Sequence, residues 1–119
     1  MSGPTELLEI TTRLEGGRTV VEIAGEIDVY SAARLRERLV ELAQAGRYRL
    51  IIDMTIVTFM DSSGLGVLVG AMKRARANGG EVCIVGAAEH ILQTLRITGL
   101  TRVFPIYASV VEALSKVAT

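Results

Sequence analysis

Apolar and polar residues alternate along the first part of this chain, as they do in a β-strand with one solvated face. Even-numbered residues from Leu8 to Thr12 occupy one side of the pattern, and charged or polar odd-numbered residues occupy the other. The Gly16-Gly17 pair that follows is a favourable hairpin connection, and residues 19–24 resume the strand pattern. We therefore expect two antiparallel strands near the N-terminus.

Farther along, apolar residues recur every three or four positions, which predicts helices. The first spans about residues 32–45, with Ser31 as its expected N-cap and Gly46 just after its end. A second helix follows Ser62 and ends at Asn78-Gly79-Gly80. Its expected inward side chains are Leu65, Leu68, Val69 and Met72.

Two shorter helices are expected toward the C-terminus. One spans about residues 89–98 and ends before Gly99, and Ser109 is the expected N-cap of the other. The inward residues of this last helix are predicted to be Val110, Ala113, Leu114 and Val117.

Three short strands separate these helices. Residues 50–53 and 81–85 are rich in apolar side chains and are expected to be buried on both faces of a sheet. A loop through Thr55 and Thr58 follows the first of them. Residues 103–106 predict a last strand, and Pro105 suits an edge position because proline donates no ladder hydrogen bond.

This order of elements predicts the fold class. Because helices join successive strands after the first hairpin, those strands should be parallel neighbours. Residues 1–119 are thus expected to form a single α/β domain after a short flexible N-terminus at residues 1–5. Its sheet should be mixed, mostly parallel and five-stranded, with an antiparallel N-terminal hairpin and about four helices.

Composition narrows the range of functions. Thirteen basic residues balance thirteen acidic ones, so charge gives no reason to expect binding to nucleic acid or to an anionic membrane. Hydrophobic residues make up 50% and aromatic residues only 4%, which predicts an aliphatic core. The single Cys83 lies in an apolar run and is expected to be a buried hydrophobic residue, with no disulfide inside the chain. Without a signal peptide or a long apolar segment, we expect a soluble cytoplasmic protein.

The residue types offer no convincing catalytic apparatus, so we do not expect an enzyme. His90 is the only histidine, and no nucleophile elbow surrounds Ser62. One histidine and one cysteine cannot build a zinc site. Asp28, Asp53 and Asp61 each end or follow a strand, and three carboxylates are able to hold Mg²⁺. Solvation or capping is the preferred interpretation for Asp53.

The stretch 59–70 is the most distinctive in the chain. Between a strand and a helix it places an acid, two hydroxyls and two glycines, namely Asp61, Ser62, Ser63, Gly64 and Gly66. Asp and Ser are preferred N-cap residues, so capping alone explains the first three. Each glycine costs a helix about 1 kcal/mol relative to Ala, which favours a surface that a partner approaches closely.

This stretch leads to a hypothesis about modification. A hydroxyl in the first turn of a helix lies beside unpaired N–H groups and the positive end of the helix dipole, where an added negative charge is stabilised. We hypothesise that Ser62 is phosphorylated. The glycine spacing does not match a dinucleotide-binding loop, and the stretch follows the third strand rather than the first.

The sequence resembles a known family. Met60-Asp61-Ser62-Ser63-Gly64-Leu65-Gly66 resembles the signature of the anti-sigma factor antagonists, which are bacterial single-domain STAS proteins. Gly25-Glu26-Ile27-Asp28 is similar to the same family, as is Ile97-Thr98-Gly99-Leu100 with Phe104 and Pro105. The resemblance covers nearly the whole chain and implies a STAS fold and a partner-switching regulator of transcription.

The resemblance also implies partners. In that family the unphosphorylated protein binds an anti-sigma factor that is also a serine kinase, and so frees a sigma factor. The kinase modifies the serine directly after the aspartate, here Ser62, and a PP2C-type phosphatase reverses the modification; Ser63 is the weaker candidate. ATP and Mg²⁺ belong to the kinase, so no cofactor is expected for this chain. Alone, the protein is expected to be a monomer or a weak dimer.

The docking surface implied by the resemblance comprises Asp28, Tyr30, Asp61, Ser62, Ser63, Gly64, Leu65 and Gly66. Asp28 corresponds to the family's acid that lies near the modified serine. Two other functions stay open: a structural STAS subunit of a signalling scaffold, and a small-ligand or lipid-transport STAS component. A scaffold subunit should form large particles, whereas a partner-switching protein should not.

Overall fold

The computed structural model describes residues 8–117. Within them the elements follow the order β1 (Leu8–Glu15), β2 (Arg18–Ile27), α1 (Ala32–Gln44), β3 (Arg49–Met60), α2 (Ser62–Ala77), β4 (Glu81–Val85), α3 (Glu89–Ile97), the 3₁₀ helix η2 (Leu100–Arg102), β5 (Ile106–Tyr107) and α4 (Val110–Val117). The predicted flexible segment 1–5 lies outside the described residues.

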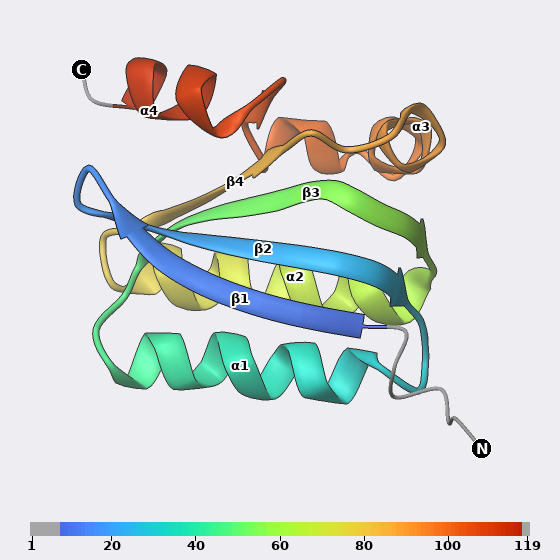
Figure 1. The fold of residues 1–119 in the computed structure, drawn as a ribbon, viewed down its shortest axis with the longest axis horizontal. Helices are drawn as coiled ribbons and strands as arrows, with labels where there is room; N and C mark the ends of the chain where they lie inside the picture. Colours follow the sequence, from blue (N-terminus) through green and yellow to red (C-terminus); the bar gives the residue numbers. More distant parts are fainter. Residues whose placement is uncertain (1–7, 118–119) are drawn as a thin grey trace.

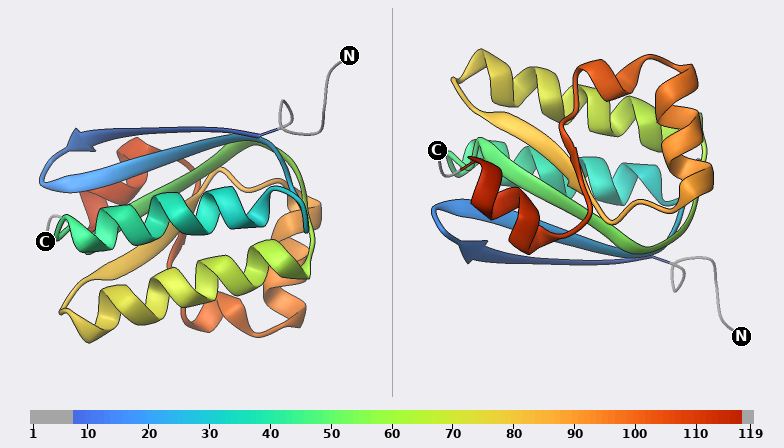
Figure 2. Two further views of the ribbon diagram at one scale, coloured as in Figure 1. Left: turned by 90° about the horizontal axis from the view of Figure 1, so that it is seen from below. Right: turned by 90° about the horizontal axis from the view of Figure 1, so that it is seen from above.

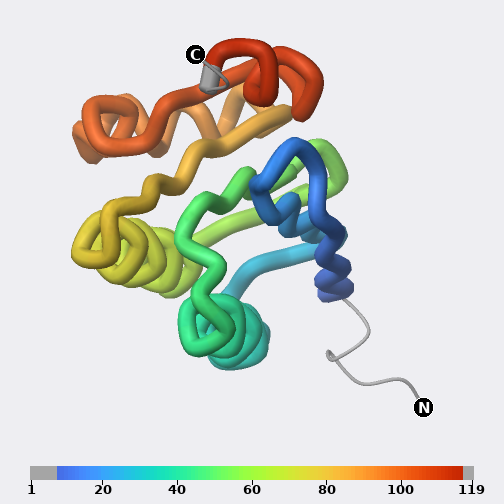
Figure 3. Tube along the Cα trace, turned by 90° about the vertical axis from the view of Figure 1, so that its left-hand side faces the viewer, coloured from blue at the N-terminus to red at the C-terminus, as the bar shows by residue number. Residues whose placement is uncertain are grey.

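The five strands form one sheet in the order β1-β2-β3-β4-β5. β1 and β2 are antiparallel, and every later pair is parallel, which confirms the predicted mixed sheet. In Figure 1, α1 and α2 lie below the sheet and α4 lies above it. Figure 3 shows the same layers from one end of the molecule.

Two apolar clusters occupy the two faces of the sheet. The larger lies between the sheet and the pair α1 and α2, and it also takes in side chains of α3. Its completely buried members include Ile23, Ile27, Leu35, Ile52, Met54, Leu68, Ile84, Leu95 and Phe104. The smaller contains Val20, Ile51, Cys83, Val85 and Ala113, with α4 packed over it. As predicted, residues 50–53 of β3 and residues 82–85 of β4 are buried on both faces, and Glu81 is partly buried.

Cys83 lies in the smaller cluster as a buried free thiol. Burial raises the pKa of this thiol to about 11, because the apolar surroundings disfavour the charged thiolate. The expectation of a buried hydrophobic cysteine is confirmed.

The hairpin and the second strand differ in length from the prediction. Gly16 and Gly17 have φ of 58° and 78°, values that favour glycine, so the Gly-Gly turn is confirmed. β2 runs beyond residue 24 to Ile27, because β3 continues alongside it to the pair Ile27–Met60.

β3 is longer than predicted. The expected strand at residues 50–53 continues through the expected loop to Met60, for 12 residues in all. The pairing of β2 with β3 shifts register twice, between Glu22 and Ala24 and between Gly25 and Glu26, and each time β3 supplies one extra residue. Such β-bulges disturb the apolar alternation of a strand, and so they hide it from a periodicity argument.

Asp53 lies inside β3, next to the first bulge, and not at the end of a strand. Its carboxylate is buried and accepts hydrogen bonds from the backbone N–H of Thr55, at 3.0 Å, and from the Thr55 hydroxyl, at 2.6 Å. The preference for solvation or capping was therefore wrong, because this side chain satisfies the backbone of its own bulge.

β5 occurs later than predicted, at Ile106–Tyr107 in place of residues 103–106. Phe104 is completely buried in the larger cluster, which takes this part of the chain out of the sheet. The Pro105 carbonyl accepts a hydrogen bond from the Ile84 N–H at 3.0 Å, so proline contributes as an acceptor only. The predicted edge position of this strand is confirmed.

The four predicted helices are present, with small differences at their ends. Ser109 caps α4 by accepting a hydrogen bond from the Glu112 N–H at 3.1 Å, as predicted. Ala113 is buried, and Val110 and Leu114 are partly buried against the smaller cluster. The predicted inward side chain of Val117 lies outside what the structure describes.

Candidate functional site

The carboxyl ends of β2 and β3 bring two predicted site residues to one edge of the sheet. Ile27 and Met60 form the last register pair of the two strands. The Asp61 N–H donates to the Ile27 carbonyl at 3.1 Å, so the two chains remain joined where the ladder ends. Asp28 and Asp61 therefore leave the sheet side by side, at the end where parallel sheets usually carry their functional loops.

Asp61 is the N-cap of α2. It has an extended backbone, and its carboxylate accepts hydrogen bonds from the Ser63 N–H at 2.8 Å and from the Gly64 N–H at 3.4 Å. Ser62 is thus the first helical residue, and it is exposed. The capping interpretation is confirmed for Asp61, and it leaves Ser62 accessible.

This cap corrects one part of the electrostatic hypothesis. The backbone N–H groups of Ser63 and Gly64 in the first turn of α2 are not free to bind an added anion. Both already donate hydrogen bonds to the Asp61 carboxylate. A phosphate on Ser62 would compete with that carboxylate and would place a second negative group beside it. The consequence of modification is therefore mainly a new concentration of negative charge on the surface.

Asp28 organises the loop between β2 and α1. Its Oδ1 atom accepts hydrogen bonds from the Tyr30 N–H at 2.9 Å and from the Ser31 N–H at 3.0 Å. Ser31 was predicted to cap α1, but its hydroxyl makes no capping bond to the helix. That hydroxyl donates to the Glu26 carbonyl and accepts from the Asp28 N–H, each at 2.9 Å. Asp28 thus fixes the turn before α1, and neither side chain caps the helix itself.

The same contacts change the acidity of Asp28. The Ser31 N–H, the largest influence, and the Tyr30 N–H and the Ser31 hydroxyl hold the pKa of this carboxyl below its ordinary value, while partial desolvation opposes them. The carboxylate is directed into its own loop, and no hydrogen bond joins Asp28 to Ser62 among residues 8–117. We conclude that Asp28 positions the loop that it begins.

That loop displays apolar side chains. Tyr30 is 78% exposed, and Val29, beside it, is 64% exposed. Phe59, just before the end of β3, is 45% exposed. Of these exposed residues, only Tyr30 was predicted from the sequence to lie on the docking surface. Val29 could have been included, because it directly follows Asp28, the acid predicted to lie in this loop.

Three predicted docking residues of α2 differ in accessibility. Gly64 is buried, and a Cβ atom there would lie 2.6 Å from Cγ2 of Ile27 and 2.7 Å from Cγ of Met60. Gly64 therefore lets α2 pack against the ends of β2 and β3, and it was wrongly expected on a docking surface. Gly66 is exposed, with no atom within 4 Å of a Cβ placed there, and Leu65 is partly buried against the core.

The hydrogen bond that the structure shows for the His90 ring is to β3. His90 is an exposed residue in the first turn of α3, and its Nε2 lies 3.2 Å from the Thr58 carbonyl. A carbonyl oxygen only accepts, so Nε2 carries the proton in this contact. His90 thereby fastens α3 to the end of β3.

The three aspartates do not form a metal site. Asp28 and Asp61 accept from backbone N–H groups in their own loops, and Asp53 accepts from Thr55. Across residues 8–117, no group of three or more His, Cys, Asp or Glu side chains is arranged to hold a metal ion.

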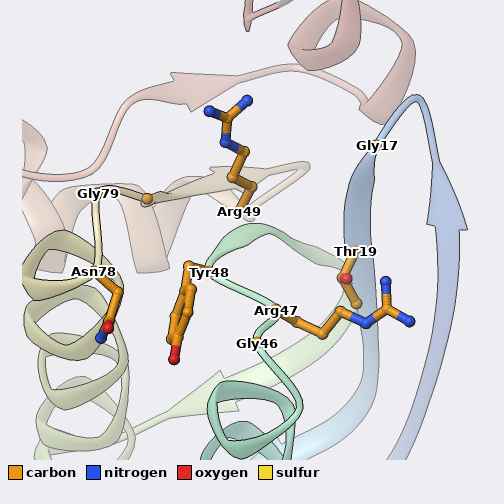
Figure 4. A pocket seen from close by; sticks show the side chains of 9 residues that line it. Gly17, Thr19, Gly46, Arg47, Tyr48, Arg49, Asn78 and Gly79 are labelled. Carbon is orange, nitrogen blue, oxygen red and sulfur yellow. The ribbon is translucent and has the colours of Figure 1, made fainter.

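A polar pocket of about 230 Å³ lies at the other end of the strands (Figure 4). Its lining includes two arginines, Arg47 and Arg49, between glycine-rich turns. Figure 4 shows the two side chains leaving the backbone in different directions, Arg47 toward Thr19 and Arg49 away from it. They do not converge on a single anion, so this pocket is not a candidate for the functional site.

The profile of the STAS domain family matches residues 9–113, which is most of the chain. The chain belongs to the STAS domain family. No helix among the residues that the structure describes is long and apolar enough to cross a membrane.

Curated relatives of this STAS domain include anti-sigma-B factor antagonists. The chain is 47% identical over 88 residues to the anti-sigma-B factor antagonist of Bacillus subtilis, covering 74% of this chain and 80% of the relative. It is 39% identical over 80 residues to the protein of the same name from Staphylococcus epidermidis. This match covers 67% of this chain and 74% of the relative. An anti-sigma factor antagonist from Mycobacterium paratuberculosis has a similar crystal structure, with a TM-score of 0.88, 26% identity and 100% coverage of both chains.

The two glycines of α2 allow a matched test of the packing at the site. Gly64→Ala should lower the free energy of unfolding by about 1–3 kcal/mol, because its Cβ would overpack against Ile27 and Met60. Gly66→Ala, the control, should raise it by up to about 1 kcal/mol, because the space is open and Ala favours a helix. Urea unfolding of the three proteins measures both changes. Equal effects of the two substitutions would contradict the assigned packing.

The loop of Asp28 predicts a pH dependence. A carboxylate whose pKa is lowered in the folded state contributes stability above its unfolded pKa, and that contribution is lost as the pH falls through the folded value. A ¹³C NMR titration should therefore show Asp28 ionising below the ordinary range for Asp, and Ser31→Ala should move its pKa upward. An Asp28 that titrates at its ordinary value in the wild-type protein would show that these hydrogen bonds do not form.

Proposed function

We propose that this STAS domain protein is an anti-sigma factor antagonist that is switched by phosphorylation of Ser62. Its unphosphorylated form binds an anti-sigma factor and so releases a sigma factor for transcription. The names of its relatives support the class of function. The observation that carries the switch is the position of Ser62, exposed at the first residue of α2 and directly after its acidic cap.

The physical basis of the switch is charge at a docking surface. A phosphate adds about −1.5 to −2 charges at neutral pH. On Ser62 it would lie beside the Asp61 carboxylate, and a docked partner would have to remove water from both. Because the Ser62 side chain is exposed, the charge can be added without repacking the core. Phosphorylation then weakens the complex while the domain keeps its fold.

We infer a docking surface formed by residues at this edge of the sheet. Tyr30 and Val29 supply exposed apolar area on the loop that leaves the sheet next to Asp61, and Gly66 leaves the helix backbone open to close approach. Exposed tyrosines are frequent anchors of protein interfaces, because they bury a large area at a small entropy cost. Leu65 is expected to contribute only its exposed part, and Gly64 acts through packing alone.

The proposal includes the two enzymes that add and remove the phosphate on Ser62. The anti-sigma factor is proposed to be the serine kinase that modifies Ser62 with its own ATP and Mg²⁺, and a PP2C-type phosphatase to remove the phosphate. We place the protein in the cytoplasm, as a monomer or weak dimer when it is alone. It takes part in this cycle as a substrate and a ligand, with no catalytic residue of its own.

Substitutions at two adjacent serines test the proposal. In the presence of ATP, Ser62→Ala should remain bound to the anti-sigma factor that co-purifies with the protein, because the charge cannot be added. Ser62→Asp should bind at least about tenfold more weakly than the wild type without ATP, or about 1.4 kcal/mol. Calorimetry of the purified pair measures both, and Ser63→Ala should behave as the wild type.

Two results would overturn this assignment. Equal affinities of the wild type and Ser62→Asp would remove the electrostatic basis of the switch. Release of Ser62→Ala by ATP, with Ser63→Ala retained, would move the modification to Ser63.

A further inference from the structure

Within residues 8–117, a helix covers only one half of the upper face of the sheet. α4 packs over the cluster that contains Val20 and Ile51, near the beginnings of β2 and β3. The right-hand view in Figure 2 shows α4 over that end, while β3 continues beyond it with no described helix above. The second half of this face comprises side chains toward the ends of the same strands.

Register identifies the side chains on that second half. Val21, Ile23 and Ile27 of β2 lie in the larger cluster below the sheet, so the residues between them point upward. Paired residues share a face, so their partners in β1 and β3 point the same way. We call this surface the open face, and it consists of Glu9, Thr11, Glu22, Ala24, Glu26, Ile56 and Phe59, with the buried Asp53 beneath them.

The second bulge of β3 brings two of its apolar residues to the same face. Ile56 and Phe59 are three residues apart, and in a regular strand they would point to opposite faces. The second register shift of β3 lies between them, because Ala24 pairs with Ile56 and Glu26 pairs with Phe59. As a result both are on the open face, 52% and 45% exposed. Bulges of this kind re-aim side chains and are common beside functional surfaces.

Charge determines what this surface can bind. The charged residues that the register places on the open face are the glutamates and the buried Asp53. The nearest basic residue of β1 on this side is Arg13, which pairs with Val20 at the end that α4 covers and which interacts with Glu15, Glu22 and Asp53. The carboxylates outnumber it, so the open face is acidic. Glu9 and Ala24 are paired, and Glu26 is paired with Phe59, so carboxylates border the apolar centre. This arrangement repels nucleic acid and anionic membranes, and it complements a protein segment that carries basic residues around an apolar stripe.

The backbone indicates that the segment is a helix. β2 and β3 are inner strands, so their backbone groups are already paired and recognition has to use side chains. On the same side of the sheet, α4 already packs an apolar stripe against the strands. We propose that the open face docks an amphipathic helix of a partner protein, with apolar residues against Ile56 and Phe59 and with Lys or Arg residues facing the bordering glutamates.

Site-specific photo-crosslinking in the native cells tests this proposal. A photoreactive phenylalanine replaces Ile56, and a matched control places the same residue at Ile97, which is 77% exposed on α3 and away from the open face. We expect at least tenfold more crosslinked product at position 56. The crosslinked peptide should come from another protein and should show Lys or Arg around apolar residues at helical spacing.

Variants that reverse a charge or remove an apolar side chain test whether residues of the open face bind the partner. Glu9→Lys and, separately, Phe59→Ser should reduce crosslinking at position 56 at least tenfold, and Glu41→Lys, on the exposed side of α1, should not. Thermal unfolding of each variant confirms that it folds. Ser62→Asp should leave the yield at position 56 unchanged, so this test succeeds or fails independently of the phosphorylation switch.

Five results would overturn the proposal. Equal yields at positions 56 and 97 would show that nothing docks selectively on the open face. Crosslinks to peptides of this chain would show that a second copy occupies it. A crosslinked peptide without basic residues, or no effect of Glu9→Lys, would contradict the charge argument. Loss of the crosslink in Ser62→Asp would make the open face part of the Ser62 surface.

Discussion

The parallel ladder between β2 and β3 is the constraint on which the rest of the molecule depends. It carries the core on both sides of the sheet, and it ends at the pair Ile27–Met60. Because the Asp61 N–H is bonded to the Ile27 carbonyl, the two chains leave this ladder together. Gly64 then allows α2 to pack directly on the same two residues. The place of Ser62 on the surface follows from these contacts and not from the serine itself.

Both acids at this edge of the sheet are used to hold backbone. Asp61 caps α2, and Asp28 ties the loop of Tyr30 to the start of α1. A carboxylate that accepts backbone N–H groups fixes the loop that carries it, so the surface around Ser62 is organised before any partner arrives. Such a surface responds to an added phosphate through charge alone, which suits a switch between partners that leaves the fold unchanged.

Patterns in the sequence predicted those parts of the fold that depend on interactions between residues close together in the chain. The Gly16-Gly17 turn, the four helices, the buried Cys83 and the Asp61 cap each depend on residues close together in the chain. The extension of β3 was not predictable in this way, because its two bulges exist only against the register of β2.

The errors at individual residues have the same origin in long-range contacts. Gly64 was expected on the surface, because the Ile27 side chain that fills its space comes from a distant strand. The residue before Pro105 was expected in a strand, whereas the core requires Phe104. Asp28 and Ser31 are both good capping residues three positions apart. Both accept hydrogen bonds from backbone N–H groups of the loop before α1, and composition could not tell that Ser31 would not cap the helix itself.

Peptide mapping by mass spectrometry of the protein isolated from its native cells tests the central claim most directly. The account predicts a single phosphate on the peptide that contains Ser62, at the Ser62 hydroxyl, in an amount that changes with growth condition. A protein that carries no phosphate on Ser62 under any condition would contradict it.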